Sequence, residues 1–593
     1  MTYRAPVSDM LFTMRHVAGL DRSIEEGVYG DLSVDLVESI LQEAGRFSAD
    51  VLAPLNRIGD SHGSRLQDGK VITPPGWKEA YKGWSDAGWN AVSGPSDHGG
   101  QGLPTLVNAA CVEMWNASCF AFGLGPMLTM GAVEALAAHG SDDLKARYLG
   151  KLVSGEWMAT MNLTEPQAGS DLNAVRTRAE RAADGTYRIS GQKIFITYGE
   201  HDLTDNIIHL VLARLPDAPP GTRGISLFLV PKILPDGTKN DVRCSGVEHK
   251  LGIHASPTCT MAYGDNGGAI GWLVGEENRG LACMFTMMNN ARLLVGVQGV
   301  AIADRAYQQA LAYASERRQG RAPTGSGDGM SPIVHHPDVQ RMLMTMKALT
   351  WAARAICLLT AAAIDHSHLA PDADARKVAH ERASLLTPVA KAFSSDVGIE
   401  VASLGMQVHG GMGYIEETGA AQYLRDARIA AIYEGTNGIQ AIDLVSRKLP
   451  LSGGAAVQAQ IAAMRAVVQR LIKEGGVAFG HSAARLRVAV ESLDRATSFM
   501  LKAFASNAPE QALAGASPYL RLFGLAQGGA ALAEIALAAS ASISGGDADP
   551  AHPARIALCR FFAENLMTAA QGLEESVITG SGFVQDAQLA LAS

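Results

Sequence analysis

A block of strand-like sequence, set between long helical stretches, limits most strongly how this chain can fold. Its segments are short, rich in β-branched residues and separated by Gly, Pro and Asp, and they span 184–190, 193–197, 207–213 and 224–230. Before the block, apolar residues recur at helical spacing over about 32–56, and further helical stretches follow over about 104–153. The sequence therefore predicts a mainly α protein with a small central β domain.

Helical periodicity returns after the block and continues through the rest of the chain. The periodic segments cover 281–318, 338–367, 373–408 and 436–448, and a Gly- and Pro-rich loop at 320–333 joins the first two. A chain of 593 residues is too long for one hydrophobic core, because cores stop growing near about 250–300 residues. We expect four domains: helical 1–158, β 159–280, helical 281–449, and an additional Ala-rich helical domain at 450–593.

Charge and composition exclude several classes of protein. The net charge of −9 disfavours a nucleic-acid binder, which usually presents a basic surface. We find no run of about 20 uninterrupted apolar residues and therefore expect no membrane span. The N-terminus lacks a signal or transit pattern, which makes a cytoplasmic location the default. The seven cysteines include no CxxC pair, so neither disulfides nor a metal site is expected.

Three short segments carry residues suited to ligand chemistry. MNLTEPQAGSD (161–171) offers hydroxyls and N–H groups for a heteroaromatic ring or a phosphate, and the glycines of QVHGGMGY (407–414) let a backbone approach a ligand closely. YEGTNGIQ (433–440) places a carboxylate just before a helix. Each segment also has a plain structural interpretation, respectively a capping turn, a loop and a helix-start carboxylate. Arg292, near the start of an apolar helix, is equally suited to an ion pair.

The order of these motifs resembles the acyl-CoA dehydrogenase family. LTEPQAGSD is followed by GQKIFITYG, the strand block, the helix with Arg292, ASERRQGR, QVHGGMGY and finally YEGTNGIQ. The resemblance covers roughly residues 35–448 and implies the helical–β–helical fold of that family. It also implies FAD bound between subunits of an oligomer, an acyl-CoA substrate, and formation of an α,β-double bond in the acyl chain.

The resemblance assigns roles to individual residues. Those matched to FAD contacts are Thr164, Ser170, Thr197, Arg317, Gln407, Gly410, Gly411 and Thr436, of which Arg317, Gln407, Gly410 and Gly411 would reach the FAD of the neighbouring subunit. Those matched to substrate contacts are Ser170, Arg292, Tyr433 and Gly435. Gly438 departs from the family pattern, because several relatives have Gln or Glu there, and Asn437 is a candidate replacement for the missing flavin contact.

Glu434 matches the catalytic base of the family. The base removes the α-proton while hydride leaves the β-carbon for flavin N5, and hydrogen bonds must polarise the thioester carbonyl. Desolvation by bound acyl-CoA would raise the pKa of the carboxylate and make it a stronger base. Some relatives carry their base just before the arginine of the substrate-binding helix. Here that residue is Ala291, which cannot accept a proton.

The additional C-terminal domain and the run GIHASPTC (252–259) resemble a long bacterial subgroup of the family. That subgroup includes enzymes acting on methylmercaptopropionyl-CoA in dimethylsulfoniopropionate breakdown. The resemblance implies a homodimer and an electron-transfer flavoprotein as electron acceptor. Alternatives are a fatty acyl-CoA dehydrogenase of β-oxidation, an acyl-CoA oxidase, and a DNA-associated flavoprotein of the same fold. The last requires a basic C-terminal domain, whereas residues 451–593 hold 10 Lys and Arg against 11 Asp and Glu.

Overall fold

The computed structural model describes residues 3–323, 329–506 and 509–592 and begins with a helical region. Its main helices are α1 (Val7–His16), α3 (Val34–Phe47), α4 (Leu55–His62), α5 (Trp77–Asp86), α6 (Thr105–Ser118) and α7 (Phe120–His139). The side chain of Ser33 caps α3 by accepting a hydrogen bond from the Leu36 N–H at 3.2 Å. The helix predicted at about 32–56 is α3 followed by a π-helical turn, Ser48–Leu52.

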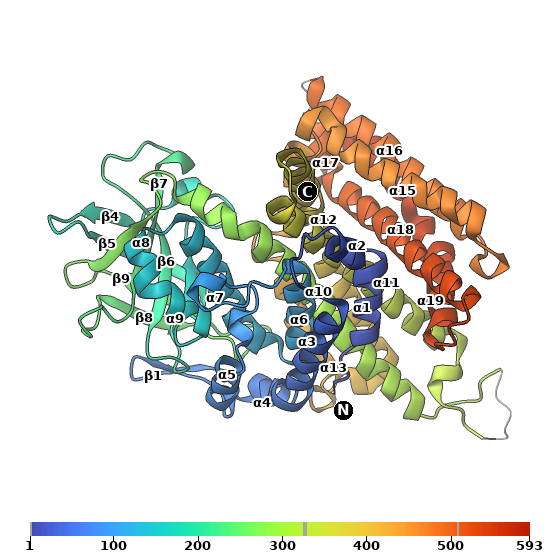
Figure 1. The fold of residues 1–593 in the computed structure, drawn as a ribbon, viewed down its shortest axis with the longest axis horizontal. Helices are drawn as coiled ribbons and strands as arrows, with labels where there is room; N and C mark the ends of the chain where they lie inside the picture. The colour runs from blue at the N-terminus through green and yellow to red at the C-terminus, as the bar shows by residue number, and fades with distance from the viewer. Residues whose placement is uncertain (1–2, 324–328, 507–508, 593) are drawn as a thin grey trace.

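An eight-stranded sheet follows and lies to one side of the helices (Figure 1). Its strands are β3 (Met158–Asn162), β4 (Arg178–Arg181), β5 (Tyr187–Thr197), β6 (Ile207–Arg214), β7 (Ile225–Pro231), β8 (Val242–Val247), β9 (Thr258–Tyr263) and β10 (Ala269–Val274). The order is β10-β7-β6-β4-β5-β9-β8, with β3 parallel to β6. All four predicted strand segments are strands, and the first two form the single strand β5. Strand β7 is buried along its whole length, which explains its continuous apolar run.

Long helices form the centre of the molecule (Figure 1). They are α10 (Gly280–Glu316), α11 (Pro337–Leu369) and α12 (Ala373–His409), followed by α13 (Ala420–Ala427) and α14 (Asn437–Asp443). Glycines bring α10 very close to α12, because a Cβ on Gly299 would lie 2.3 Å from the carbonyl oxygen of Ser394. The described residues of the predicted loop at 320–333 include an isolated β-bridge between Pro332 and Arg318 and the start of a 3-10 turn, Ile333–His335; residues 324–328 lie outside the described chain.

The C-terminal helices pack on α11 and α12 (Figure 1). They include α15 (Ala455–Glu474), α16 (Ser482–Ala505), α18 (Ala516–Ser544), α19 (Ala551–Phe561), α20 (Ala570–Ile578) and α21 (Phe583–Leu591). Helix α18 approaches α12 closely, since a Cβ on Gly524 would lie 2.2 Å from the ring of Phe393. The predicted boundaries of the four domains lie beside the starts of β3 and α10 and the turn Leu451–Gly454. The division itself stays a prediction.

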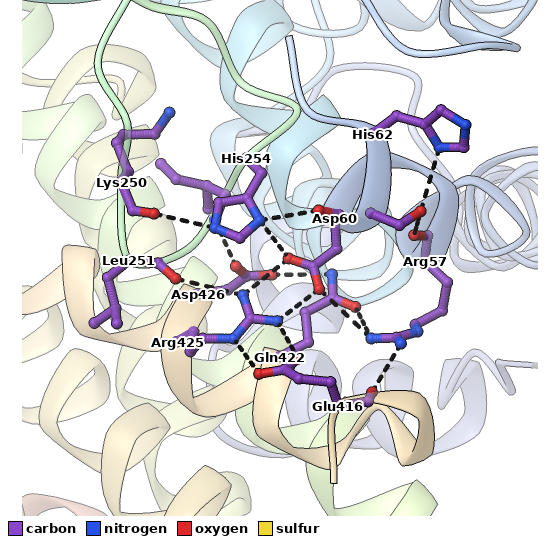
Figure 2. A network of polar contacts seen from close by, with 12 residues as sticks. Arg57, Asp60, His62, Lys250, Leu251, His254, Glu416, Gln422, Arg425 and Asp426 are labelled. Carbon is purple, nitrogen blue, oxygen red and sulfur yellow. Dashed lines mark hydrogen bonds and ion pairs between the residues drawn. The ribbon is translucent and has the colours of Figure 1, made fainter.

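A polar network joins the β domain to the helices around it (Figure 2). His254, in the GIHASPTC run, lies 3.0 Å from Asp60 Oδ1 on α4. Arg425 on α13 forms an ion pair with the same Asp60 at 2.6 Å, and the neighbouring Asp426 accepts a hydrogen bond from the Ile253 N–H at 2.6 Å. The run therefore connects the sheet to α4 and α13.

The next observations concern the seven cysteines and the longest apolar helices. All seven cysteines are buried and free. The expectation that no segment is long and apolar enough to cross a membrane is wrong, because three helices meet those criteria by length and composition: Phe120–His139, Pro337–Leu369 and Ala516–Ser544. Between 83% and 94% of the apolar window of each is buried inside the protein. A helix surrounded by other helices is apolar on every face, which accounts for their composition.

Candidate active site

Glu434 lies in a short loop between the 3-10 turn Arg428–Ala431 and α14. Its φ is +55°, a conformation that non-glycine residues seldom adopt outside functional or strained sites. Thr436, and not Glu434, caps α14, because its hydroxyl accepts a hydrogen bond from the Ile439 N–H at 3.2 Å. Gln440 donates to the carbonyl oxygen of Glu434 at 3.2 Å. The carboxylate is therefore not needed to cap the helix.

The carboxyl group of Glu434 faces two cations. Burial raises the pKa of Glu434, and the positive charges of Arg292 on α10 and Lys391 on α12 oppose that rise. Partial burial makes the ionised carboxylate a stronger base, while the two cations favour its ionised form. The Glu434 N–H donates no hydrogen bond within the described residues, so it is free to bind an oxygen atom of a ligand.

Arg292 approaches the Glu434 loop from α10. Its Nη1 lies 3.5 Å from Asp443 Oδ2, a long ion pair, and its buried Nε finds no partner in the part of the chain that the structure describes. Its Nη2 lies 3.9 Å from the position that a Cβ on Gly435 would occupy. Arg292 thus forms the ion pair that its sequence context also suggested, and it lies beside the loop that carries Glu434. Ala291, the preceding residue, is buried and carries no titratable group.

Tyr433 starts a chain of buried polar groups that sequence reasoning missed. Its hydroxyl donates a hydrogen bond to the side-chain oxygen of Gln298 on α10. Gln298 donates in turn to the side-chain oxygen of Asn116 on α6 at 3.1 Å. Asn116 packs against α7, where a Cβ on Gly123 would lie 2.6 Å from it. These hydrogen bonds link the loop of the candidate base to α10 and α6 in the interior.

The two motifs predicted to contact flavin lie side by side in the sheet domain. The Ile194 N–H in β5 donates to the carbonyl oxygen of Thr164 at 2.9 Å, which brings Thr164 close to the strand that ends at Thr197. The hydroxyls of Thr164, Ser170 and Thr197 form no hydrogen bond within the described chain. Phe195, in the second motif two residues before Thr197, has a φ of +60° and is 58% exposed. Free hydroxyls beside an exposed aromatic face suit a polar heteroaromatic ring.

A buried ion pair holds these motifs together. Lys193 Nζ lies 2.9 Å from Glu165 Oε1, and both side chains are almost completely buried. Glu165 also accepts hydrogen bonds from the Thr177 hydroxyl at 2.6 Å and the Arg176 N–H at 2.7 Å. A capping turn is present as well, because Asp171 accepts from the Asn173 N–H at 2.9 Å. No spacing in the sequence pairs Glu165 with Lys193, so this contact was not predicted.

The remaining residues matched to FAD lie at the far ends of α10 and α12. Tyr313 stacks on His409 with ring centroids 4.4 Å apart, which places Arg317 near Gln407 and the glycines that follow α12. Gly410 has a φ of +60°, and a Cβ on it or on Gly411 would meet no atom within 4 Å. The 37 residues of α10 span about 55 Å at 1.5 Å per residue. Helix α10 begins against β7, so this group lies at the opposite end of α10 from that strand.

Asn437, the candidate for the flavin contact beside the exposed Gly438, already has partners within the chain. Its side chain points to α12, where it accepts a hydrogen bond from Lys391 Nζ at 2.8 Å and donates to Asp396 Oδ1 at 2.7 Å. These bonds hold the amide inside the helical region, and a flavin contact of Asn437 stays a prediction. Thr436 uses its hydroxyl as the helix cap, and its flavin contact stays a prediction.

Comparison with known proteins identifies the family. The models that match are the N-terminal (37–156), middle (160–265) and C-terminal (278–449) domains of acyl-CoA dehydrogenase and an acetyl-CoA dehydrogenase C-terminal-like domain (456–588). The chain is 48% identical to the 3-methylmercaptopropionyl-CoA dehydrogenase of Ruegeria pomeroyi, over 98% of this chain and 99% of that protein. The chain belongs to the acyl-CoA dehydrogenase family. It is therefore an FAD-dependent oxidoreductase that acts on acyl-CoA.

More distant relatives agree with this assignment. A butyryl-CoA dehydrogenase of Syntrophomonas wolfei is 37% identical and covers 76% of each chain. Among solved structures, Caenorhabditis elegans ACDH-11 in complex with C11-CoA has a TM-score of 0.77 at 21% identity and covers 95% of this chain and 92% of its own. An acyl-CoA dehydrogenase from Bacillus anthracis complexed with FAD has a TM-score of 0.75 at 21% identity, covering 94% and 91%. The predicted α–β–α fold with an additional helical region is confirmed.

Proposed function

We propose that Glu434 is the base that removes the α-proton of the acyl-CoA substrate. The observation that carries this proposal is the loop itself, which holds a partly buried carboxylate at positive φ beside Arg292 and Lys391. Ala291 leaves the alternative position of the base without a proton acceptor. The free N–H of Glu434 would donate to the thioester carbonyl and stabilise the negative charge that develops there.

The residues of the sheet domain fit FAD. Thr164 and Thr197 present free hydroxyls on neighbouring segments of the sheet domain, and Ser170 lies exposed in the loop that follows Thr164, where it would contact the pyrophosphate or the CoA. FAD bound there supplies the acceptor for the hydride that leaves the β-carbon. The protein holds the substrate between that acceptor and Glu434, with Tyr433 and Gly435 lining the thioester pocket and Arg292 beside them.

We propose a short acyl chain as the substrate, with 3-methylmercaptopropionyl-CoA as the first candidate. The Ruegeria pomeroyi relative carries that name and matches nearly the full length of the chain. The buried chain Tyr433–Gln298–Asn116 supports a short pocket, because these three side chains occupy the interior next to Tyr433, which we expect to line the thioester pocket. The expected products are the 2,3-unsaturated acyl-CoA and two reducing equivalents, which we propose pass to an electron-transfer flavoprotein in the cytoplasm.

The test of the base uses the purified yellow holoenzyme. Glu434→Gln should retain FAD and acyl-CoA binding and lose turnover by about 1000-fold or more, since the reaction cannot start without proton removal. Glu417→Gln, which alters an exposed carboxylate, serves as the matched control and should keep wild-type turnover. Near-normal turnover in Glu434→Gln would place the base elsewhere.

The test of the substrate is a turnover panel. Butyryl-, octanoyl-, palmitoyl- and 3-methylmercaptopropionyl-CoA are compared by kcat/KM, with an electron-transfer flavoprotein or a dye as acceptor and with oxygen uptake measured in parallel. The short thioesters should be preferred, and oxygen uptake should be slow. Preference for palmitoyl-CoA would contradict the short pocket, and rapid oxygen uptake would favour the acyl-CoA oxidase alternative.

We further propose that two chains complete each FAD site in a homodimer. The resemblance assigns Arg317, Gln407, Gly410 and Gly411 to the FAD of the neighbouring subunit, and these residues lie together at the C-terminal ends of α10 and α12, where Gly410 and Gly411 face open space. Mixing inactive Thr197→Ala chains with inactive Arg317→Ala chains tests this arrangement. A mixed dimer then contains one intact site and regains activity. A site built within one chain would carry one defect in every copy and regain none.

A further inference from the structure

Lys391 is a fully buried lysine on α12. Its Nζ donates a hydrogen bond to the side-chain oxygen of Asn437 at 2.8 Å. Asn437 is the first residue of α14 and follows Glu434 by three positions. The lysine thus contacts the chain shortly after the candidate base. Lys391 is also one of the two cations whose positive charge lowers the pKa of Glu434.

Asn437 is fixed to α12 by more than this one bond. Its amide nitrogen donates to Asp396 Oδ1 at 2.7 Å and to Ser395 Oγ at 3.0 Å. The Ser395 hydroxyl also lies 3.2 Å from the oxygen that accepts from Lys391. Because every polar atom of the amide has a partner on α12, the start of α14 has little freedom to move. The loop that carries Glu434 is thereby tied to a long central helix.

A buried ammonium group is costly unless carboxylates lie near it. Burial lowers the pKa of Lys391 to about 7; Glu434 and Asp396 oppose this effect, whereas Arg292 on α10 adds to it. Asp396 in turn faces Arg521 of α18 and Arg428 of the turn before Glu434. The charge of Lys391 is therefore balanced chiefly by the candidate base and by Asp396.

We propose that Lys391 is a positioning residue for the reaction: its buried ammonium anchors Asn437, and through it the Glu434 loop, and its positive charge favours the ionised, proton-accepting form of Glu434. This inference rests on the proposed role of Glu434 as the base. It adds a residue that is distant in sequence from the motifs of the active site and that lies on the helix covered by the C-terminal domain.

The C-terminal domain supports this arrangement from the other side of α12. Gly524 of α18 lies against the ring of Phe393, two residues after Lys391. Arg521 of α18 stacks over the same ring, with its guanidinium carbon 5.2 Å from the centroid, and forms an ion pair with Glu400 at 2.9 Å. The segment of α12 that holds Asn437 is therefore packed between the catalytic loop and α18.

The experiment compares four variants of the holoenzyme. Lys391→Met removes both the charge and the hydrogen bond, Lys391→Gln keeps a donor without the charge, and Lys391→Arg keeps the charge. Lys377→Met, an exposed lysine on the same helix, is the matched control. FAD content, kcat and KM are measured with butyryl-CoA and 3-methylmercaptopropionyl-CoA from mildly acidic to mildly alkaline pH.

The expected result follows from the sign of the charge. Loss of a nearby cation raises the pKa of a carboxylate, so the acidic limb of the kcat/KM profile should move to higher pH by about one unit in Lys391→Met and Lys391→Gln. The Lys391→Met variant should also lose about tenfold in kcat because Asn437 is released. Lys391→Arg and Lys377→Met should keep the wild-type limb.

An unmoved acidic limb in Lys391→Met or Lys391→Gln that still binds FAD would overturn the proposal. If Lys391→Met does not fold, Lys391→Gln carries the same test, because its amide can still satisfy Asn437. Failure of the underlying base assignment has a different signature. In that case Glu434→Gln retains turnover, whatever the Lys391 variants show.

Discussion

The buried ion pair between Glu165 and Lys193 allows a quantitative prediction about the flavin side of the site. Burial acts to raise the pKa of Glu165, but the Lys193 ammonium and the hydrogen bonds from Thr177 and Arg176 lower it from 4.5 to about 2. Burial lowers the pKa of Lys193 from 10.5 to about 8, and Glu165 opposes that change. The two groups therefore depart from their ordinary values by similar amounts.

These changes correspond to about 3 kcal/mol each and have opposite signs for stability. Glu165 has a lower pKa in the folded state, so it contributes stability above pH 4.5 that is lost as the pH falls toward 2. Lys193 also has a lower pKa in the folded state, and for a cation this costs free energy, fully so below about pH 8. At neutral pH the intact pair is therefore close to neutral for stability, as buried ion pairs often are.

Breaking the pair has a much larger effect. Lys193→Met leaves the Glu165 carboxylate buried without its cation, which costs about 3–5 kcal/mol. Because the Ile194 N–H binds the Thr164 carbonyl, local opening exposes this amide, and its hydrogen exchange should accelerate by about 100-fold or more. FAD affinity should fall in parallel. The double variant Glu165→Gln/Lys193→Met removes both charges and should recover about 2–3 kcal/mol of the loss.

Hydrogen-exchange mass spectrometry on peptides covering 158–177 and 187–197 measures this effect locally. A local measurement is preferable because a multidomain flavoprotein does not unfold in one two-state step. Peptides from α16, in the C-terminal domain, provide the internal control and should exchange as in the wild type. Unchanged exchange in Lys193→Met, or a double variant more labile than Lys193→Met, would refute the reasoning.

Two further predictions concern helix packing and pH. Gly524→Ala forces a Cβ to within 2.2 Å of the Phe393 ring and should destabilise the protein by about 1–3 kcal/mol in thermal unfolding, whereas Gly572→Ala, a helical site with open space, should not. Burial raises the pKa of Glu134 to about 7, and Asn290 opposes the rise. This carboxyl therefore destabilises the fold increasingly as the pH rises from 4.5 to about 7, so Glu134→Gln should melt higher than wild type above pH 7 and lose that advantage in acid. A difference independent of pH would contradict it.

The fold could be predicted from the sequence because the local periodicity of apolar residues distinguishes its helices from its strands. β-branched segments became β5, β6 and β7, and the long periodic segments became α10, α11 and α12. The failed expectation about membrane-length helices shows the limit of this reasoning. Arg354 interrupts the apolar run of α11 in sequence, yet in the structure it is buried and paired with Glu113 at 2.6 Å and Asp304 at 3.1 Å. A charged residue in an apolar helix can therefore be buried, and the apolar segment can continue past it, when carboxylates from other helices pair with it.

The candidate site likewise contains residues that the sequence indicated and contacts that it did not. Ordered motifs indicated Glu434, Arg292 and the hydroxyls of the sheet domain, because each motif is contiguous in sequence. The contacts that hold them in place, such as Lys391 with Asn437, join residues separated by dozens of positions. A single sequence contains no signal that pairs such residues, so the supporting contacts became visible only in the folded chain.

Helix α12 connects three parts of the molecule that the sequence presents separately. Near its middle, Lys391 holds the start of α14 beside Glu434, and Phe393 packs against Gly524 of the C-terminal domain. At its end, Gln407 and Gly410 form the group proposed to reach the FAD of the neighbouring subunit. A displacement of α18 would therefore be transmitted to the base through one turn of α12, and to the proposed subunit contact along the rest of the helix. On this view the C-terminal domain acts on the reaction by fixing α12, and a variant that loosens Gly524 against Phe393 should reduce kcat as well as stability.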